Sequence, residues 1–223
     1  MRALVVGAGP GLSASFARLL AWEGFEVALA ARNAGKLEEL ARQTGASAHG
    51  CDAADPAQVA SLFAQVGPQD VVLYNPSFRV RGPFLDLDPA DVAKTLAVTA
   101  FGGFLVGQAA ARGMVARGSG CILFTGASAS VKGYAQSAPF AMGKFALRGL
   151  AQSMARELHP KGVHVAHVVV DGGIRSAGRA DPPDAPDSTL APDAIAQTML
   201  HVLRQPRSAW SDEVAVRPWV ERF

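Results

Sequence analysis

Short apolar runs alternate with helical segments from one end of the chain to the other, and this pattern restricts the fold more than any other feature. The strand-like runs are residues 3–6, 25–30, 46–51, 70–74, 121–125, 163–170 and 213–216. The helical segments are residues 12–23, 33–43, a helix opened by Asp55-Pro56, a long helix from Asp88-Pro89 to about 116, and residues 137–158 and 192–203. Strands that are apolar throughout are typical of a parallel sheet covered on both faces. Right-handed crossovers then predict a doubly wound α/β fold.

Length and composition limit the possible classes of protein. The 223 residues correspond to one domain of ordinary size, and neither a linker nor an internal repeat divides them. Hydrophobic residues make up 49% of the chain and charged residues 18%, which is enough apolar material for a large core. The net charge is +2 without any block of like charge, so we expect no nucleic acid or membrane surface as partner. We find no apolar run of the roughly 18 residues that a transmembrane helix needs.

Cysteine and histidine usage adds two expectations. Cys51 and Cys121 each lie beside a predicted strand and far from the other. We therefore expect buried free thiols in a reducing compartment. The apolar start of the chain imitates a signal peptide, but Gly7, Gly9 and Gly11 interrupt it, so we expect a cytoplasmic protein. The histidines have no partners at metal-ligand spacing, so no metal site is expected.

A glycine-rich turn joins the first strand to the first helix. Gly7, Gly9 and Gly11 precede Leu12 and Ser13, where the helix begins. Glycines let the backbone turn sharply and approach a pyrophosphate, and the helix start offers unpaired N–H groups to an anion. We interpret the turn as a phosphate cradle; a tight turn without a ligand is the alternative.

The spacing of this turn resembles the short-chain dehydrogenase/reductase family, whose pattern is Gly-x-x-x-Gly-x-Gly. Gly7 and Gly11 match, and Ser13 replaces the last glycine, where its hydroxyl either hydrogen-bonds a phosphate or crowds the nicotinamide side. The resemblance extends over residues 2–176, with the segments in the family's order. It implies a single-domain Rossmann fold over residues 1–223, a seven-stranded parallel sheet in the order 3-2-1-4-5-6-7, and a nicotinamide cofactor.

The resemblance also indicates which nicotinamide cofactor binds. In the family, an acidic residue at the end of the second strand binds the ribose hydroxyls of NAD; here Ala31 takes that place and Arg32 follows. A guanidinium suits a 2′-phosphate, so NADP is expected in preference to NAD, unless Arg32 is only a solvated helix-start residue. Asp52 matches the aspartate that binds the adenine amino group, or else forms an Asx turn. Asn75 matches the first asparagine after the fourth strand.

The family's chemistry uses a tyrosine, a lysine four residues later, a serine 12 to 13 residues before the tyrosine, and an asparagine in the preceding long helix. Lys144 is in place, but Phe140 stands at the tyrosine position. Ser128, 12 residues before Phe140, is the expected serine, although a spacing of 13 selects Ala127. Thr99 occupies the asparagine position. The chain therefore resembles an atypical member that lacks the active-site tyrosine.

A substitute proton donor has one nearby candidate. Tyr134 lies in the loop that leads into the active-site helix, ten residues before Lys144, and Lys132 adds a charge to the same loop. A tyrosine that packs on the substrate or lies at the surface is the alternative.

The segment after the sixth strand matches the family only loosely. Ile174 and Ser176 fit the groups that bind the nicotinamide carboxamide. Asp171 replaces the family's proline and is interpreted as a solvent-facing turn residue, or as one that orients Arg175 or touches a polar substrate. The Asp- and Pro-rich stretch 180–188 is expected to be a surface loop where a substrate lid would lie.

Two functions are consistent with these residues. In the first, the protein is an NADPH-preferring oxidoreductase for a small carbonyl or alcohol: Ser128 polarises the carbonyl, Lys144 holds the ribose, and Tyr134 or a water delivers the proton. In the second, it binds NADP without turnover, as a sensor or regulatory subunit, because losing a positioned acid costs about 10²–10⁴ in rate.

The resemblance further implies a homodimer or homotetramer that assembles through the two long helices, residues 88–116 and 137–158. The C-terminal segment, with Trp219 and Phe223, covers either a neighbouring chain or the protein's own core.

Overall fold

The computed structural model describes residues 1–221, and its strands form a seven-stranded sheet. The strands are β1 (Arg2–Val6), β2 (Glu26–Ala31), β3 (Ser47–Gly50), β4 (Val71–Tyr74), β5 (Gly120–Thr125), β6 (Val163–Val170) and β7 (Glu213–Val216). They lie in the order β3-β2-β1-β4-β5-β6-β7, and each neighbouring pair is parallel. The predicted fold class and strand order are confirmed.

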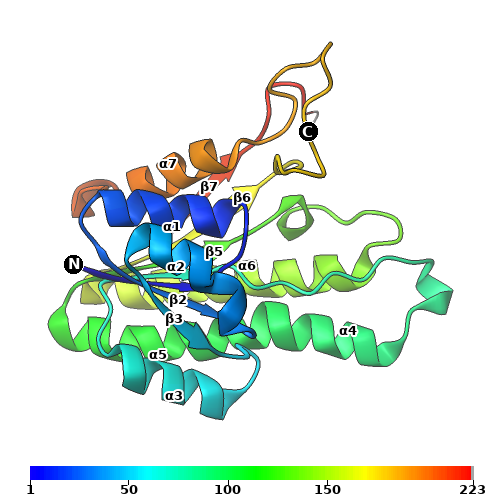
Figure 1. The fold of residues 1–223 in the computed structure, drawn as a ribbon. Coiled ribbons are helices and arrows are strands. Elements are labelled where there is room, and N and C mark those ends of the chain that lie inside the picture. The colour runs from blue at the N-terminus through cyan, green and yellow to red at the C-terminus, as the bar shows by residue number, and fades with distance from the viewer. Residues whose placement is uncertain (222–223) are drawn as a thin grey trace.

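Helices cover both faces of the sheet (Figure 1). The helices are α1 (Leu12–Trp22), α2 (Glu38–Thr44), α3 (Pro56–Val66), α4 (Pro89–Leu96), α5 (Gly102–Arg117), α6 (Ala138–Leu158) and α7 (Pro192–Leu203). The buried side chains of α1, α2 and α7 belong to one core, and those of α3, α5 and α6 belong to the other. All eight residues of β6 are buried, which explains why the strands are apolar on both faces.

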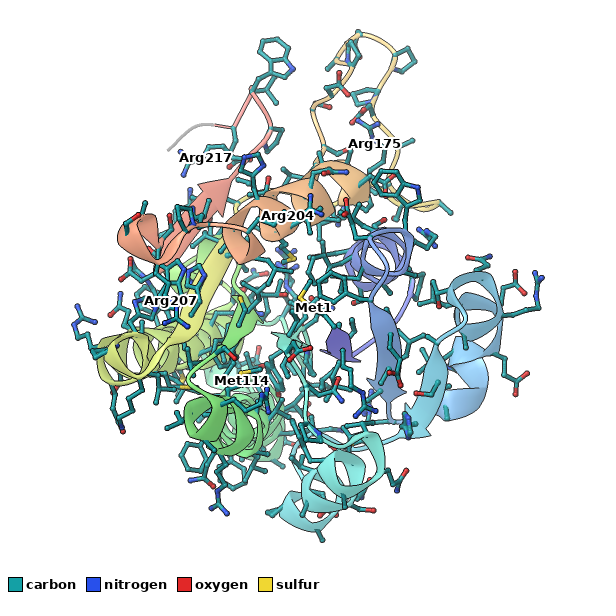
Figure 2. The ribbon with its side chains drawn as sticks, turned by 90° about the vertical axis from the view of Figure 1, so that its left-hand side faces the viewer. Met1, Met114, Arg175, Arg204, Arg207 and Arg217 are labelled. Atoms are coloured by element: carbon teal, nitrogen blue, oxygen red, sulfur yellow. The ribbon has the colours of Figure 1, made fainter. Side chains whose placement is uncertain are left out.

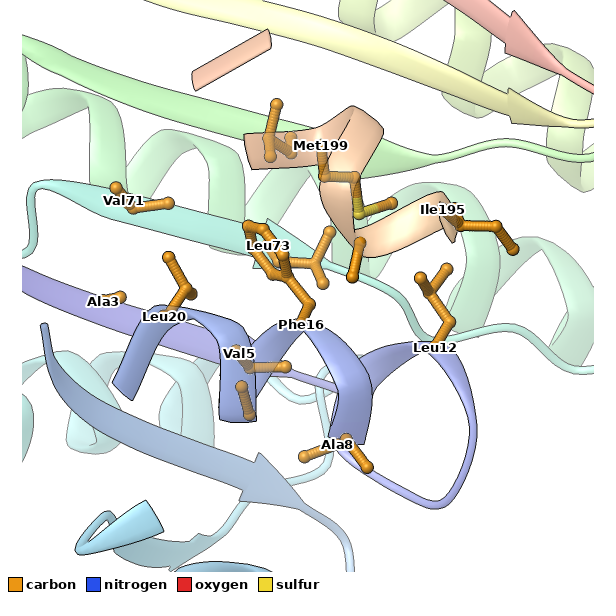
Figure 3. Packing of buried hydrophobic residues seen from close by; sticks show 14 of the residues in the cluster. Ala3, Val5, Ala8, Leu12, Phe16, Leu20, Val71, Leu73, Ile195 and Met199 are labelled. Carbon is orange, nitrogen blue, oxygen red and sulfur yellow. The ribbon is translucent and has the colours of Figure 1, made fainter. Parts of the chain in front are cut away.

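A hydrophobic core between α1, α7 and the sheet holds α1 in place, and the glycine turn leads into this helix (Figure 3). Phe16 and Leu20 of α1 are fully buried against β1 and β4, and Met199 of α7 is fully buried in the same cluster. Burying one such side chain stabilises the fold by roughly 1.5–3 kcal/mol. The turn is therefore held by a rigid strand on one side and a well-packed helix on the other.

The helix start signals of the sequence are confirmed in detail. The Asp55 carboxylate accepts from Ala57 N at 2.8 Å and from Gln58 N at 3.2 Å. Asp88 accepts from Ala90 N at 2.8 Å. Each cap contributes on the order of 1 kcal/mol. The predicted helix 33–43 differs, since it begins as a 3₁₀ turn (Ala34–Leu37) before α2.

The long helix contains a π-helical turn (Ala97–Phe101) between α4 and α5, which the sequence pattern does not predict. The Tyr74 hydroxyl donates to the Val98 carbonyl at 2.5 Å, and so satisfies a carbonyl within this turn. Thr99 is fully buried there, and Phe78 N lies 3.5 Å from its hydroxyl oxygen. A π-helical turn inside an α-helix is frequent at functional sites.

The same helix corrects an expectation about membrane segments. Residues Pro89–Arg117 form a helix of 29 residues that is long and apolar enough to cross a membrane by length and composition. Polar residues interrupt its apolar run, so a search for uninterrupted apolar residues does not find it. In this fold the helix packs one side on the sheet, where Val106 and Met114 are fully buried.

The loop between β6 and α7 projects from one end of the molecule beside the C-terminal segment, with Arg175 on the loop and Arg217 on that segment (Figure 2). The Trp219 indole N–H donates to the Pro186 carbonyl at 3.3 Å, so Trp219 contacts the loop, whereas Val214 and Val216 of β7 pack against the core. Trp219 is 76% exposed. Phe223 lies outside the described residues.

Candidate active site

Two adjoining clefts follow the carboxyl ends of the strands. The larger has a volume of about 720 Å³ and the smaller about 330 Å³, and both are bordered by Asn75 and Ser77 after β4. Of the residues singled out from sequence, the larger cleft brings together Gly11, Leu12, Asn75, Ser128, Tyr134, Phe140, Lys144, Ile174 and Ser176. The smaller brings together Gly7, Arg32, Asp52 and Asn75. Ligands of open parallel sheets bind in this position.

The glycine turn is held narrow by its neighbours. Gly7 has a φ of +75°, and a Cβ there would lie 2.7 Å from Pro76 N. The N–H groups of Gly7 and Ala8 both donate to the Ala30 carbonyl, at 2.9 and 3.0 Å. Gly11, with a φ of +91°, precedes α1, whose start has no side-chain cap. The unpaired N–H groups of the first helical turn are therefore available to an anion.

Ser13 and Gly9 are not among the residues that line the two clefts. The Ser13 hydroxyl donates to the Gly7 carbonyl at 3.1 Å and accepts from Asn75 Nδ2 at 2.7 Å. Ser13 is 2% exposed, so this hydroxyl ties the glycine turn to the end of β4. This geometry favours a structural role for the Ser13 hydroxyl over the expected contact with a phosphate.

The smaller cleft presents one cation and one carboxylate. Arg32 is exposed and forms no ion pair with the carboxylates of residues 1–221. The Asp52 carboxylate accepts from Ala54 N at 3.0 Å, so the predicted Asx turn is present. Asp52 also borders the cleft, and its side chain can serve both purposes.

Lys144 is buried at the base of the larger cleft. Its ammonium donates to the Thr125 carbonyl at 2.7 Å, and only 3% of the residue is exposed. Burial lowers the pKa of Lys144 to about 8. The Phe140 ring lies one helical turn earlier, with its centroid 5.9 Å from the Lys144 ammonium and 4.9 Å from Arg79 Cζ.

Ser128 and Tyr134 border the same cleft from the loop between β5 and α6. Tyr134 is 46% exposed, and the Lys132 ammonium lies 5.8 Å from its ring centroid. The pKa of Lys132 is raised, first by its hydrogen bond with the Tyr134 side chain and further by the Asp171 charge. A cation and a phenol therefore adjoin at the mouth of the cleft.

Asp171 does not face solvent and does not pair with Arg175, which corrects both expectations. It is 2% exposed, and its carboxylate lies 3.8 Å from Lys132 Nζ and 3.4 Å from Arg217 Nε. The carboxylate thus joins the Tyr134 loop to the segment after β7. The sequence places these partners far apart, so only the fold brings them together.

A buried polar network supports the loop that carries Ser128. Ser130 Oγ accepts from Ala127 N at 3.0 Å and lies 3.3 Å from His167 Nε2. His167 Nδ1 in turn lies 3.0 Å from the Glu213 carboxylate, which Arg148 binds through two hydrogen bonds. Ser130 and His167 are fully buried, so this network positions the backbone and does not reach the cleft.

Sequence reasoning missed three arginines that line the larger cleft: Arg79, Arg81 and Arg179. They come from the loops after β4 and β6. Arg79 and Arg81 are two residues apart in the sequence, which suggests that both point the same way, but no local pattern indicates that Arg179 joins them.

Comparison with known proteins identifies the family. The sequence profile of the short chain dehydrogenase family matches residues 1–182. The chain therefore belongs to the short-chain dehydrogenase family, whose members use NAD(P).

Individual relatives agree with this assignment. The chain is 31% identical over 189 residues to the L-xylulose reductase of Bos taurus, covering 82% of this chain and 78% of that protein. A short-chain dehydrogenase structure from Rhodopseudomonas palustris is 35% identical, with a TM-score of 0.85 and 98% of each chain covered. A metagenomic short-chain oxidoreductase solved in complex with NADP is 28% identical, with a TM-score of 0.85; the match covers 99% of this chain and 98% of that one.

Proposed function

We propose that the protein is an NADPH-preferring oxidoreductase that interconverts the carbonyl and alcohol forms of a small substrate. Family membership and the reductase relatives support the reaction class, and the NADP complex of a structural neighbour supports the cofactor. The observation that carries the proposal is one continuous edge of the sheet, along which the glycine turn, Lys144 and Tyr134 border adjoining clefts.

The residues present fit a phosphorylated dinucleotide. The narrow turn at Gly7 and the uncapped start of α1 suit a pyrophosphate. Arg32 offers an unpaired guanidinium for a 2′-phosphate, and Asp52 offers a carboxylate for the adenine amino group. Ile174 and Ser176 border the larger cleft, where the nicotinamide end would lie.

NADPH, when bound, supplies the hydride for carbonyl reduction. Negative charge then develops on the substrate oxygen, which needs a hydrogen-bond donor and a proton. The Ser128 hydroxyl donates to this oxygen, and the Tyr134 phenol releases its proton to it. Lys132 lies beside the phenolate that this transfer leaves, and Asp171 holds Lys132 there. Lys144 holds the ribose from the base of the cleft.

In this proposal the chain is an atypical member of its family. Phe140, one helical turn before Lys144, lacks a proton to donate, so the acid comes from Tyr134 on the opposing loop. Tyr134→Phe is expected to lower kcat by about 10²–10⁴ while the Kd for NADPH stays unchanged. Stopped assays of NADPH oxidation with a panel of carbonyls and enones measure this. Full activity of Tyr134→Phe would show that the donor is wrong.

Phe140→Tyr is the companion variant. It places a phenol on the helical face that carries Lys144. We expect turnover to rise, and to survive in Phe140→Tyr combined with Tyr134→Phe. A double variant as inactive as Tyr134→Phe alone would contradict a site organised for a donor at residue 140.

The cofactor preference has its own test. Arg32→Ala is expected to weaken NADPH about tenfold, the loss of roughly one charge-assisted contact, and to leave NADH unaffected. Fluorescence titration with each nucleotide measures the ratio. Equal losses for both nucleotides would remove Arg32 from the 2′-phosphate site.

A second candidate function is a non-catalytic NADP-binding sensor or regulatory subunit. Phe140 and Thr99 favour it, because both stand at positions where the family carries catalytic groups. Micromolar NADPH binding without turnover of any carbonyl or enone would select this function over the first.

We also propose a cytoplasmic homodimer or homotetramer. The described residues include several exposed apolar side chains on the helices that the family uses for assembly: Phe101, Phe104, Met142 and Phe145. Cys51 and Cys121 are buried free thiols, in keeping with a reducing compartment.

A further inference from the structure

The larger cleft has a one-sided charge that the family assignment does not explain. Its described lining residues include four arginines and Lys144, and among them is neither an aspartate nor a glutamate. The whole chain is nearly balanced, with 21 Lys and Arg against 19 Asp and Glu. The cations are therefore concentrated in this cleft by the fold rather than by composition.

One of the four arginines is already neutralised. The Arg175 guanidinium binds the carboxylates of Asp181 and Asp187, the latter at 3.0 Å. Asp181 also accepts from Thr189 N at 2.8 Å. Arg175 therefore fixes the loop between β6 and α7 and is not available to a ligand.

The other three arginines lack such partners. Arg79, Arg81 and Arg179 form no ion pair with the carboxylates of residues 1–221. Burial, and then the charges of Arg81 and Arg179, lower the pKa of Arg79. Arg79 is thus close enough to Arg81 and to Arg179 for both positive charges to act on its guanidinium, and all three residues line the same cleft.

Two of them are also positioned by local contacts. The Arg79 guanidinium lies over the Phe140 ring, with Cζ 4.9 Å from its centroid. The backbones of Arg179 and Ser176 exchange two hydrogen bonds, of 2.9 and 3.0 Å. The Arg179 side chain passes over Gly173, where an added Cβ would lie 3.1 Å from Arg179 Cδ. Cations from opposite loops therefore face one cleft.

We propose that Arg79, Arg81 and Arg179 bind an anionic group of the substrate, a carboxylate or a phosphate, at the outer part of the larger cleft. Guanidiniums bind both oxyanions through paired, charge-assisted hydrogen bonds. This inference rests on the proposed oxidoreductase function, since it names the class of its substrate. The Phe140 ring then acts as the platform for Arg79.

Binding of matched pairs to the protein saturated with NADP⁺ tests the proposal by calorimetry. Acetoacetate is compared with methyl acetoacetate, and dihydroxyacetone phosphate with dihydroxyacetone. We expect at least one anion to bind about tenfold or more tighter than its neutral twin. The pair that shows the difference identifies the carboxylate or the phosphate. Equal affinities within both pairs would overturn the proposal.

The variants Arg79→Gln, Arg179→Gln and their combination locate the site. We expect the preference for the anion to fall by about threefold in each single variant and to vanish in the double variant. Arg112→Gln is the matched control, because Arg112 is exposed on α5, hydrogen-bonds Gln108 and is not among the residues that line the cleft. A preference that persists in the double variant would refute the assignment.

NADP⁺ affinity of the same variants separates the substrate from the cofactor. The NADP⁺ affinity of the variants is expected to stay within a few-fold of that of the unmodified protein. A loss of NADP⁺ affinity as large as the loss of anion affinity would place the guanidiniums on the cofactor's phosphates instead. Because the readout is binding, arginine-dependent anion binding without NADPH oxidation would reject the proposed function and keep this inference.

Discussion

Lys144 shows what the site demands of a single residue. Its ammonium is buried and donates a hydrogen bond to the Thr125 carbonyl at 2.7 Å. A buried charge is costly in a core, so a residue held this way costs the fold stability at neutral pH. The role proposed for Lys144, to hold the cofactor ribose, would be a physical reason to keep such a charge.

Lys144→Met tests this cost through its pH dependence. Below pH 8 the ammonium is charged in the folded and the unfolded protein, so the full cost of burial is present. Between about 8 and the ordinary value of 10.5 the folded protein loses this proton while the unfolded chain keeps it, and stability therefore rises with pH. We expect Lys144→Met to be more stable than the unmodified protein by roughly 2–3 kcal/mol at pH 7, and the difference to disappear near pH 10.5.

Urea unfolding at several pH values measures the difference. Cys51 and Cys121, whose raised pKa values of about 11 and about 12 come first from burial, are common to both proteins and cancel. Lys36→Met, at an exposed position, is the control and is expected to give a difference that does not change with pH. A pH-independent effect of Lys144→Met would contradict the burial of this charge.

At the scale of elements, the π-helical turn between α4 and α5 couples the long helix to the sheet. Tyr74 is fully buried at the end of β4, and its hydroxyl reaches the Val98 carbonyl in that turn. The next residue of β4's loop, Asn75, borders both clefts. The Tyr74 side chain therefore links the π-helical turn of the long helix to the strand end that borders the site.

Tyr74→Phe is expected to lower the free energy of unfolding by about 1–2 kcal/mol, because it removes a buried donor and leaves the Val98 carbonyl without it. Urea denaturation measures the change. Tyr134→Phe makes the same chemical change at an exposed position and is expected to stay within about 0.5 kcal/mol. Equal stabilities for both variants would mean that the hydroxyl does not hold the turn.

For the whole molecule, exposed aromatic residues lie on the two long helices through which the proposed oligomer assembles. Phe101 and Phe104 stack with ring centroids 6.3 Å apart, and Phe145 is exposed on the neighbouring helix α6. Contiguous exposed apolar side chains are uncommon on monomeric proteins and often mark a surface of association.

Phe104→Glu combined with Phe145→Glu is therefore expected to convert the proposed oligomer to a monomer, because burying two carboxylates in an interface is unfavourable. Sedimentation velocity measures the mass. Trp22→Glu, on the exposed end of α1, is the control and should leave assembly intact. If the double variant sediments like the unmodified protein, the interface lies elsewhere.

Local rules account for the parts of this fold that the sequence predicts. Asp55 and Asp88 cap helices that begin at the following proline, and apolar runs form the buried strands, because these features depend on neighbouring residues or on burial of a whole strand. The strand order was instead implied by the resemblance to the family, and the sheet confirms it. Most of the predicted site residues from the glycine turn to Ser176 border the two clefts, with Gly9 and Ser13 as exceptions, because parallel strands end at one edge of the sheet.

The sequence by itself thus determined the sheet, the helices around it and the edge at which the chemistry lies. Tertiary structure alone decided that Ser13 binds Asn75, that Asp171 pairs with Lys132 and Arg217, and that three arginines without an ion pair to the carboxylates of residues 1–221 share a cleft. Their partners lie many residues away or on different loops. Hydrogen bonds and ion pairs act over a few ångströms in space, so residue order does not reveal which long-range pairs the packed chain will form.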